Sequence, residues 1–382
     1  MSNSRFMEQL LDGVEVEWKA LGDVVHMRAG QYISASNIME KSSKEHRYPC
    51  FGGNGIRGFV ANNSHNGKHL LIGRQGALCG NVRRTNGKFY ATEHAVVVTP
   101  SDYINIDFAF HLLTLMNLNQ YASQSAQPGL SVGKIEGLKI PIPPLHIQAE
   151  IVRILDAFTE LTNELTNELN ARKKQYNYYR NQLLSFEEGE IEWKTLGNIF
   201  HMRAGQHISA SKIMEKATNE YIYPCFGGNG IRGYVQERSH EGEYLLIGRQ
   251  GALCGNIQRI KGQFYATEHA VVVTANPDIN IDWAFHFLTL MNLNQYASQS
   301  AQPGLTVGKL HTLKIPVPSI DKQTYVASIL DKFDALTNSL TEGLPREIAL
   351  RQQQYAYYRD LLLSFPKHNP HPTSPLTGGG VG

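Results

Sequence analysis

The sequence predicts an α+β fold in which two copies of a mixed, β-rich domain are joined by two long helices that form an antiparallel coiled coil. The chain repeats itself with a constant shift of 175 residues, from Trp18 to Trp193, and residues 113–130 are identical to residues 288–305. Each copy opens with short apolar runs between glycine-rich turns and closes with a long stretch of apolar residues at helical spacing. A repeat of this length is a domain with its connector, and two such copies behave as a covalent pseudo-dimer.

The first part of each copy predicts short strands. In copy one the apolar runs 70–72, 89–91 and 95–98 are flanked by Asn66-Gly67 and Asn86-Gly87, dipeptides typical of tight turns, so hairpins are expected. One amphipathic helix is expected to follow, at about residues 106–125.

The second part of each copy predicts a long helix. The prolines of residues 140–144 mark its start, and from 148 to 185 apolar residues recur at steps of three, four or seven. A helix of that length would run about 55 Å and needs a partner to bury its apolar stripe, which copy two supplies. In copy two a break or a fresh helix start is expected near Pro345.

These patterns predict five segments. The first β-rich domain is expected at residues 1–145, the first coiled-coil helix at 146–186, the second β-rich domain at 187–320, the second helix at 321–365, and a disordered Pro- and Gly-rich tail at 366–382.

Composition and sequence pattern argue against several classes of protein. The chain has 382 residues and a net charge of +2, so any nucleic-acid surface must be a local patch. The N-terminus has no signal-peptide pattern and no stretch is apolar enough to span a membrane, which predicts a cytoplasmic location. The cysteines are two positions seen twice, Cys50 and Cys79 with Cys225 and Cys254, without CxxC spacing, so buried thiols are expected rather than a zinc site or a disulfide.

Catalytic motifs are missing. Residues 53–58 fit GxGxxG formally, but a poor helix former follows, so a dinucleotide site is not expected and the glycines suit a close backbone approach, including that of a phosphate backbone. Glu93-His94 recurs as Glu268-His269 and is interpreted as a structural pair. No Walker A, HExxH or nucleophile-elbow motif is present, so catalysis by this chain is not expected.

Three loops, all repeated, carry side chains suited to duplex DNA. Arginine reads guanine, glutamine and asparagine read adenine, and lysine or glycine-loop amides hold phosphates. Solvated side chains on plain turns are the alternative for any one residue. The candidates in copy one are Asn54, Arg57, Arg74, Gln75, Gln127, Ser131 and Lys134, and in copy two Asn229, Arg232, Arg249, Gln250, Gln302, Thr306 and Lys309.

The whole chain resembles the specificity subunits of type I restriction-modification enzymes. The resemblance is carried by residues 17–22 (EWKALG), 140–144 (IPIPP) with Gln148, 154–156 (ILD), the Leu-Thr-Asn-Glu units, and 178–180 (YYR). It implies two target-recognition domains that each read half of a split DNA site, and two helices that act as a ruler. It also implies docking of two methyltransferase subunits, which would bring S-adenosylmethionine, and of restriction-translocase subunits. The chain itself would need no cofactor, metal or catalytic residue.

This chain departs from the family in one respect, because its two domains are nearly identical where family members usually carry unlike ones. A nearly palindromic, interrupted site is therefore expected. Two other functions stay open at this point: a stand-alone repressor with two DNA-binding domains, and a nuclease with repeated sites.

Overall fold

The computed structural model describes residues 11, 13–76, 78–124, 128–186, 191–251, 253–299, 303–339 and 341–365. The chain divides into two compact units. Unit 1 comprises Met1–Glu164 with Ala349–Gly382, and unit 2 comprises Leu165–Ile348. The expected tail at 366–382 lies outside the described residues. No helix in the described part of the chain is long and apolar enough to cross a membrane.

Unit 1 contains the first copy of the repeat. Its strands are β1 (Glu17–Ala20), β2 (Val25–Ala29), β3 (Tyr48–Gly52), β4 (Gly55–Val60), β5 (His65–Asn66), β6 (His69–Gly73), β7 (Val82–Thr85), β8 (Lys88–Ala91), β9 (Ala95–Pro100) and β10 (Lys139–Ile142). Its short helices and helical turns are α2 (Leu21–Val24), η1 (Ala35–Asn37), α3 (Ile106–Leu115), η2 (Leu118–Tyr121) and α4 (Val132–Glu136). The domain is therefore mixed and β-rich, as predicted.

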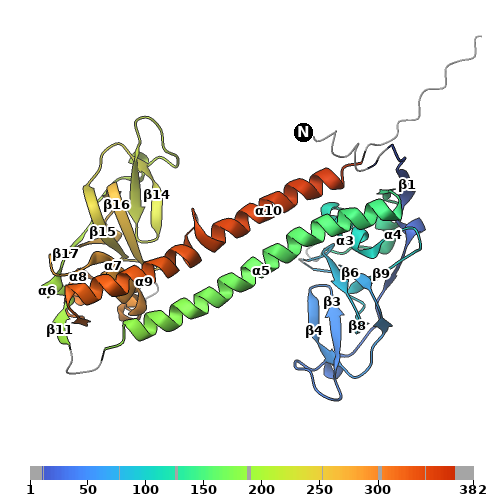
Figure 1. Cartoon of the computed structure of the whole chain (residues 1–382), viewed down its shortest axis with the longest axis horizontal. Helices are drawn as coiled ribbons and strands as arrows, with labels where there is room; N and C mark the ends of the chain where they lie inside the picture. The colour runs from blue at the N-terminus through green and yellow to red at the C-terminus, as the bar shows by residue number, and fades with distance from the viewer. Residues whose placement is uncertain are drawn as a thin grey trace, which may run out of the picture. The chain divides into compact units, whose positions relative to one another are not determined.

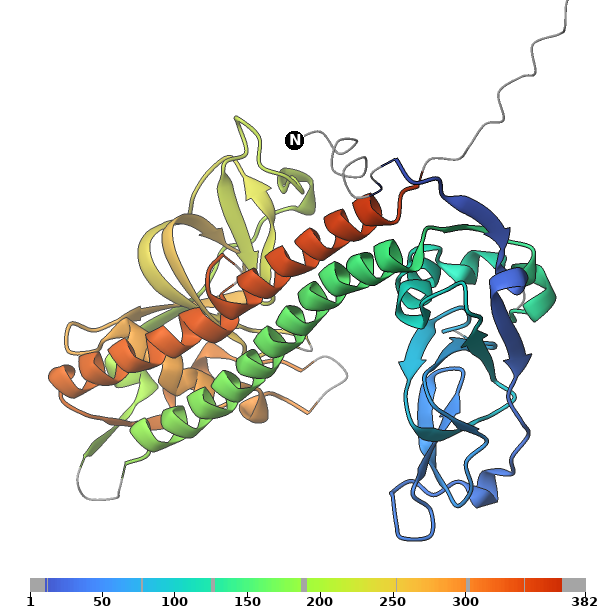
Figure 2. The same cartoon turned by 45° about the vertical axis from the view of Figure 1, so that its right-hand side comes forward.

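Two four-stranded sheets form most of this domain, with orders β2-β9-β6-β7 and β4-β3-β8-β5. Within unit 1, helices α3 and α4 lie nearest to the long helix α5 (Leu145–Leu183), and strands β3, β4 and β8 lie farthest from it (Figures 1 and 2). The core between the sheet of β6 and β9 and the helices holds fully buried side chains such as Leu70, Ile72 and Phe108.

The hairpin turns expected at Asn66-Gly67 and Asn86-Gly87 are wrong. Strand β6 pairs with β7 antiparallel and β5 with β8, so these two dipeptides lie opposite each other inside one long hairpin, where the Gly67 amide donates to the Gly87 carbonyl. The loop that closes this hairpin runs from residue 73 to residue 81 instead. Glycine and asparagine weaken a strand interior, which explains why the strands break there without turning.

The expected helix at 106–125 is also shorter than predicted. Helix α3 is capped by Asn105, whose side chain accepts from the Asp107 and Phe108 amides, and it ends at Leu115. Asn117 then adopts a left-handed conformation with φ 47°, which asparagine tolerates better than most residues, and the chain continues as η2.

Unit 2 repeats the same plan. Its strands are β11 (Glu192–Thr195), β12 (Phe200–Ala204), β13 (Tyr223–Gly227), β14 (Gly230–Val235), β15 (His240–Gly248), β16 (Ile257–Ala266), β17 (Ala270–Ala275) and β18 (Lys314–Val317). Its short helices and helical turns are α6 (Leu196–Ile199), η3 (Ala210–Lys212), α7 (Ile281–Leu290), η4 (Leu293–Tyr296) and α8 (Val307–His311). Here β15 and β16 are continuous, and one six-stranded sheet forms, with order β12-β17-β15-β16-β13-β14.

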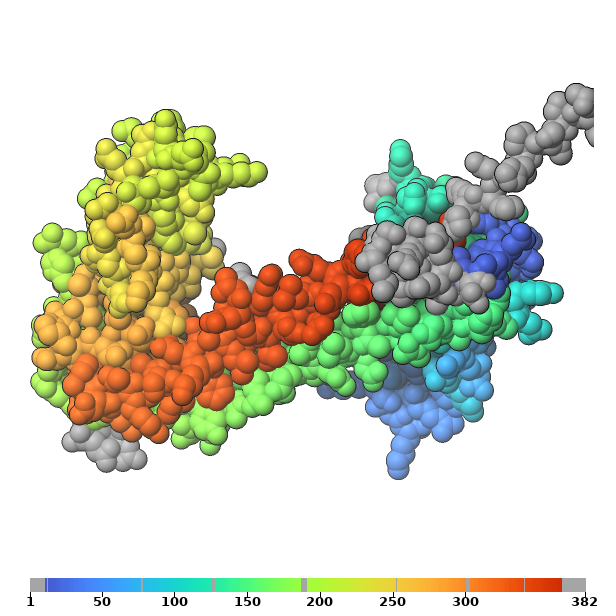
Figure 3. Space-filling view, turned by 45° about the horizontal axis from the view of Figure 1, so that its top comes forward, coloured from blue at the N-terminus to red at the C-terminus, as the bar shows by residue number. Residues whose placement is uncertain are grey.

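The long helices are α5, α9 (Ile320–Asn338) and α10 (Gly343–Leu362). Helix α5 leaves unit 1 for unit 2 and α10 returns from unit 2 to unit 1, so the two helices run antiparallel. In unit 1 the ring of Phe158 stacks on that of Tyr358, and in unit 2 Phe333 packs against Tyr176 and Tyr179. Within unit 1 the start of α5 and the end of α10 share one hydrophobic cluster, to which they contribute Leu155 and Leu362, and the two helix ends lie side by side (Figure 3).

The break predicted near Pro345 is confirmed. Helix α9 ends at Asn338, and α10 starts at Gly343 with Pro345 in its first turn, where proline needs no hydrogen-bond donor. Gly343 has φ +75°, a backbone conformation that residues with a side chain rarely adopt.

A buried polar cluster fastens each β-rich domain to the helices of its own unit. In unit 1 His111 of α3 is fully buried, and its Nε2 lies 2.8 Å from Asp156 Oδ1 on α5 while its Nδ1 lies 3.3 Å from the Tyr355 hydroxyl on α10. Arg84 of β7 also donates to Asp156, at 2.8 Å. Burial is the largest influence on His111 and lowers its pKa, although Asp156 opposes it.

Unit 2 builds the same cluster from His286, Asp331 and the Tyr176 hydroxyl, with Arg259 in the place of Arg84. The tyrosine in each cluster comes from the long helix that follows the other copy of the repeat, so both coiled-coil helices contribute to both clusters. Each domain is thereby held in a defined orientation on its own helix pair.

Candidate DNA interface

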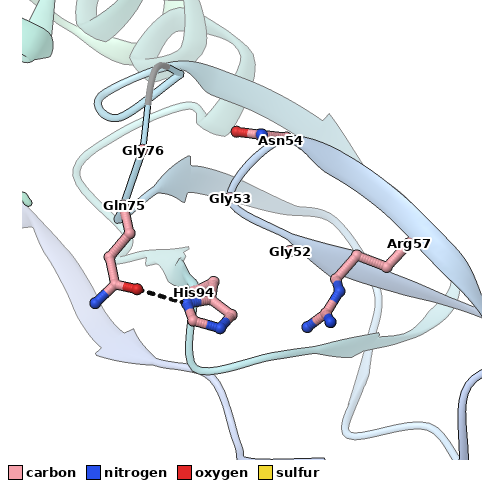
Figure 4. A pocket seen from close by; sticks show the side chains of 7 residues that line it. All are labelled: Gly52, Gly53, Asn54, Arg57, Gln75, Gly76 and His94. Carbon is pink, nitrogen blue, oxygen red and sulfur yellow. Dashed lines mark hydrogen bonds between the residues drawn. The ribbon is translucent and has the colours of Figure 1, made fainter. Parts of the chain in front are cut away.

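Three segments of unit 1 converge on one pocket. They are the β3–β4 turn, the loop that follows β6, and the turn that precedes β9. The pocket has a volume of about 310 Å³. Its lining residues, here called the loop pocket, are Gly52, Gly53, Asn54, Arg57, Gln75, Gly76 and His94 (Figure 4).

Backbone hydrogen bonds fix the loop that carries Gln75. The Arg74 amide donates to the His94 carbonyl at 2.9 Å, and the Gly76 amide donates to the Pro128 carbonyl at 3.0 Å. The Leu130 amide in turn donates to the Arg74 carbonyl at 2.9 Å. Residues on either side of Gln75 are therefore held by two neighbouring segments, and its side chain starts from a rigid base, as a recognition site requires.

The glycines of this region allow the loops to touch one another. A Cβ atom on Gly53 would lie 2.9 Å from the His94 carbonyl oxygen, and one on Gly73 would lie 2.5 Å from the carbonyl oxygens of both Gly53 and Leu78. The sequence interpretation allowed for a close approach to a phosphate backbone. In the structure the close approach is to the chain's own neighbouring loops, which explains why no side chain fits at these positions.

The predicted reading side chains of unit 1 fall into two groups. Asn54, Arg57 and Gln75 are exposed and line the loop pocket together. Arg74 is half-buried, and its Nη1 donates to the Glu93 carbonyl at 3.1 Å. The structure thus brings three of the predicted residues to one surface and places the fourth beside it.

Sequence reasoning did not place His94 in the loop pocket, because Glu93-His94 was interpreted only as a structural pair. Its Nδ1 lies 2.8 Å from Gln75 Oε1, and its Nε2 lies 3.2 Å from Glu93 Oε1. Figure 4 shows the Gln75 and His94 side chains meeting, with Arg57 on the other side of the histidine. The position of Glu-His just before a buried valine strand, at the same strand end as the Gly-Arg-Gln-Gly loop, was the available signal.

Unit 2 repeats these contacts. His269 Nδ1 lies 2.9 Å from Gln250 Oε1, and the Arg249 Nη1 donates to the Glu268 carbonyl at 3.0 Å. Asn229 and Arg232 are exposed on the equivalent turn, and a Cβ atom on Gly228 would again lie 2.9 Å from the carbonyl oxygen of the histidine, here His269. The agreement between two separate stretches of sequence shows that the arrangement is a property of the repeat.

The third predicted loop is only partly described. Gln127 and Gln302 lie outside the described residues. Ser131 and Lys134 are exposed at the start of α4, one and four residues after the hydrogen-bonded Leu130, and neither lines the loop pocket. Thr306 and Lys309 occupy the same places on α8, where the Thr306 hydroxyl accepts from the Lys309 amide at 3.2 Å.

The cysteines are buried free thiols, as expected from their spacing. Burial raises the pKa of Cys225 to about 11 and raises that of Cys50, so neither is a reactive thiolate at neutral pH. Among the described residues no group of three or more His, Cys, Asp or Glu side chains is arranged to hold a metal ion.

Comparison with known proteins decides the family. A profile described as "Type I restriction modification DNA specificity domain" matches residues 13–174 and again 188–350. The chain belongs to this family of type I restriction enzyme specificity subunits. Their part in the enzyme is sequence specificity, and the chain is accordingly a non-catalytic subunit of a multisubunit enzyme. Membership in this family argues against a nuclease or a stand-alone repressor.

Named relatives agree. The chain is 49% identical over 385 aligned residues to the type I restriction enzyme EcoprrI specificity subunit of Escherichia coli, an alignment that covers 90% of this chain and 93% of the relative. It is 34% identical to the EcoR124I/EcoR124II specificity subunit of Escherichia coli, covering 96% and 98%. The type I restriction-modification S subunit of M. genitalium shares the fold with a TM-score of 0.71 at 17% identity, covering 93% and 98%.

Proposed function

We propose that each unit reads one half of a bipartite duplex DNA site through its loop pocket and the adjoining loops. The observation that carries this proposal is the repetition of the whole arrangement, with the same side chains and nearly the same distances, in both copies of a specificity subunit. A chain with two equivalent reading surfaces suits a target that has two equivalent halves.

The side chains divide by chemistry. We assign Asn54, Arg57, Arg74 and Gln75 to base edges in the major groove, where arginine pairs with guanine and an unconstrained amide pairs with adenine. Lys134, with Ser131 and Gln127, is assigned to phosphates and to positioning. The equivalent residues of unit 2 take the same roles: Asn229, Arg232, Arg249, Gln250, Gln302, Thr306 and Lys309.

Because the reading side chains are identical in the two copies, the two half-sites should be nearly the same sequence on opposite strands. The pairing of the long helices would set their separation, at about one helical turn or ~10 base pairs from centre to centre. The bases between the half-sites would not be read.

As a specificity subunit the chain acts in a complex with DNA and with other subunits. We propose that two methyltransferase subunits dock on it and bring S-adenosylmethionine, and that restriction-translocase subunits add to that complex in the cytoplasm. DNA methylation should then appear only when the methyltransferase subunits are added. Methylation by the purified chain alone would contradict this assignment.

The reading assignment is tested by matched variants of the two copies, Arg57→Ala and Arg232→Ala. Each full chain is assembled with its methyltransferase subunits and methyl donor and offered a randomised duplex library, whose methylated members are sequenced. Arg57→Ala should lose ~1–3 kcal/mol of discrimination at one base position of one half-site, and Arg232→Ala should do so at the matching position of the other.

Lys134→Ala is the control for a phosphate contact. It should weaken all sequences alike and lower the slope of the salt dependence by about 1. If both arginine variants retain the full base preference at every position, the loop pocket does not read DNA.

A further inference from the structure

We propose that His94, with His269 in the second copy, is a specificity-determining positioning residue. It fixes the side-chain amide of Gln75 so that the NH2 group faces the DNA and reads a hydrogen-bond acceptor on a base edge. The inference rests on the proposed function, since it requires the loop pocket to face DNA.

Both ring nitrogens of His94 face oxygen atoms that accept hydrogen bonds. Nδ1 lies 2.8 Å from Gln75 Oε1, and Nε2 lies 3.2 Å from Glu93 Oε1. A neutral imidazole carries one N–H and one lone pair, so it would point a lone pair at one of these oxygens. Only the ring with a proton on each nitrogen donates to both.

The environment of Glu93 leaves its carboxylate in need of a hydrogen-bond donor. One carboxylate oxygen, Oε2, is buried and has no hydrogen-bond partner among the described residues, and the same is true of Glu268 Oε2 in unit 2. Arg74 donates to the backbone carbonyl of Glu93. A partly buried carboxylate is costly to leave without donors, and Nε2 of His94, 3.2 Å from Oε1, is a ring nitrogen within reach of it.

The ring starts from a rigid turn. The Thr92 amide donates to the Phe51 carbonyl at 2.8 Å, and the Ala95 amide donates to the Thr92 carbonyl at 2.9 Å. The His94 carbonyl itself accepts from the Arg74 amide, which ties this turn directly to the loop of Gln75. Two fixed backbones therefore hold the two side chains at hydrogen-bonding distance before any ligand arrives.

The consequence is a choice of base. With its oxygen held by His94, Gln75 presents the two hydrogens of its NH2 group to the groove. Guanine offers O6 and N7 as adjacent acceptors there, whereas cytosine offers the N4 donor. We therefore assign Gln75 to a base with an acceptor edge, guanine in preference to cytosine. Without this constraint a glutamine amide turns either face outward and pairs with adenine as well.

Unit 2 holds the same three-residue chain, with 2.9 Å between His269 Nδ1 and Gln250 Oε1 and 3.5 Å between His269 Nε2 and Glu268 Oε1. A change made in one copy leaves the other copy as an internal control in the same molecule.

The test uses the full chain assembled with its methyltransferase subunits, the methyl donor and a randomised duplex library. Gln75→Glu keeps an oxygen toward His94 and replaces the outward NH2 group by a second oxygen. The preferred base at one position of one half-site should change from an acceptor-bearing to a donor-bearing edge, by about tenfold in the ratio of methylated products. The other half-site should be unchanged.

His94→Phe removes both nitrogens and keeps a ring of similar size. Discrimination at that same position should fall about tenfold while the remaining positions keep their preferences. In a Gln75→Ala background His94→Phe should have no further effect on base preference, because a positioning residue acts only through its partner.

The outcomes distinguish the role proposed for His94 from the proposed function of the loop pocket. If Gln75→Ala alters one base position, but His94→Phe leaves the discrimination there intact and Gln75→Glu leaves the preferred base unchanged, the pocket reads DNA and the role given to His94 is wrong. The same conclusion follows if His94→Phe lowers methylation of every sequence equally in both backgrounds. If Gln75→Ala and Arg57→Ala both leave every preference intact, the proposed function fails first.

Discussion

The two units fold nearly the same sequence, yet where unit 2 builds one six-stranded sheet, unit 1 divides the corresponding strands between two four-stranded sheets. The difference lies at the middle of the long hairpin. In unit 2 Glu243 stands directly opposite Lys261 and the two form an ion pair, and the strands continue past them. In unit 1 the same positions hold Lys68 and Asn86, and the strands break there.

Cross-strand pairing explains this contrast. Opposite charges on facing residues favour a ladder, whereas asparagine is disfavoured in strands. The closing loop of the hairpin nevertheless has the same structure in both copies. The loop at residues 73–81 and its counterpart in unit 2 make the same backbone hydrogen bonds. The backbone hydrogen bonds of these loops therefore stay the same although the sequence in the middle of the hairpin differs between the two copies.

The long helices of the two copies also differ. Helix α5 is continuous over 39 residues, whereas its counterpart is broken into α9 and α10.

The largest effect on methylation is expected from deleting one Leu-Thr-Asn-Glu unit of α5 between Leu161 and Glu168. The deletion removes about 6 Å of helix, equivalent to one or two base pairs of spacer.

On the original spacing one half-site would then be out of reach, at a cost of ~2–5 kcal/mol if each half supplies half of the specific binding. Methylome sequencing of cells that carry the variant should recover the same half-sites with a shorter spacer. The role of α5 as a ruler is wrong if the original spacing is still methylated as before.

The sequence predicted much of this architecture. The repeat, the strands at 70–72, 89–91 and 95–98, the long helix and the break at Pro345 all follow from local patterns that the rest of the fold does not override. The hairpin turns were misplaced because Asn-Gly is a strong local turn signal, and only the pairing of distant strands shows that both dipeptides lie side by side in one ladder.

The lining of the loop pocket could be predicted only in part. Arg57 and Gln75 were found because side chains that pair with bases stood among glycines, a pattern visible along the chain. His94 follows Gln75 by 19 residues, and its contact with the Gln75 amide depends on how the turn before β9 meets the hairpin loop. No spacing rule connects these positions, so the contact had to come from the three-dimensional structure.

The buried histidine of each unit predicts a loss of stability in acid. Burial, partly opposed by Asp156 and Asp331, lowers the pKa of His111 and His286 below the ordinary value of 6.5. When the pH drops below 6.5, these histidines become protonated in the unfolded chain but not yet in the folded chain. The free energy of unfolding is therefore highest above pH 6.5 and decreases as the pH is lowered through this value. The denaturant concentration at the unfolding midpoint should therefore decrease when the pH is lowered from about 7.5 to about 5.5.

The control is the double variant His111→Gln, His286→Gln. It should be less stable at both pH values but should lose less between them, because the two titrating groups are gone. His65 and His240, whose pKa values are also lowered by burial, would account for the remainder. An equal loss in the variant and the parent chain would show that the clusters do not sense acid.

The smallest expected effect concerns the carboxylates of Glu93 and Glu268, which contact His94 and His269. In unit 2 Glu268 Oε1 also lies 3.0 Å from His207 Nδ1. Although burial works to raise the pKa of Glu268, hydrogen bonds from its own backbone and from His207 hold it below the ordinary value. The equivalent of His207 in unit 1 is Tyr32, whose surface is 77% exposed.

Sharing one carboxylate between two imidazoles leaves His269 less firmly held, consistent with its longer distance of 3.5 Å against 3.2 Å for His94. His207→Tyr should therefore sharpen the base preference at the Gln250 position, and Tyr32→His should relax it at the Gln75 position. Because His207 is 81% exposed and screened by solvent, each change should be only about twofold, or ~0.5 kcal/mol. Methylation of the randomised library by the two swapped chains measures both at once, and shifts of the same sign in both half-sites would refute the competition for Glu268.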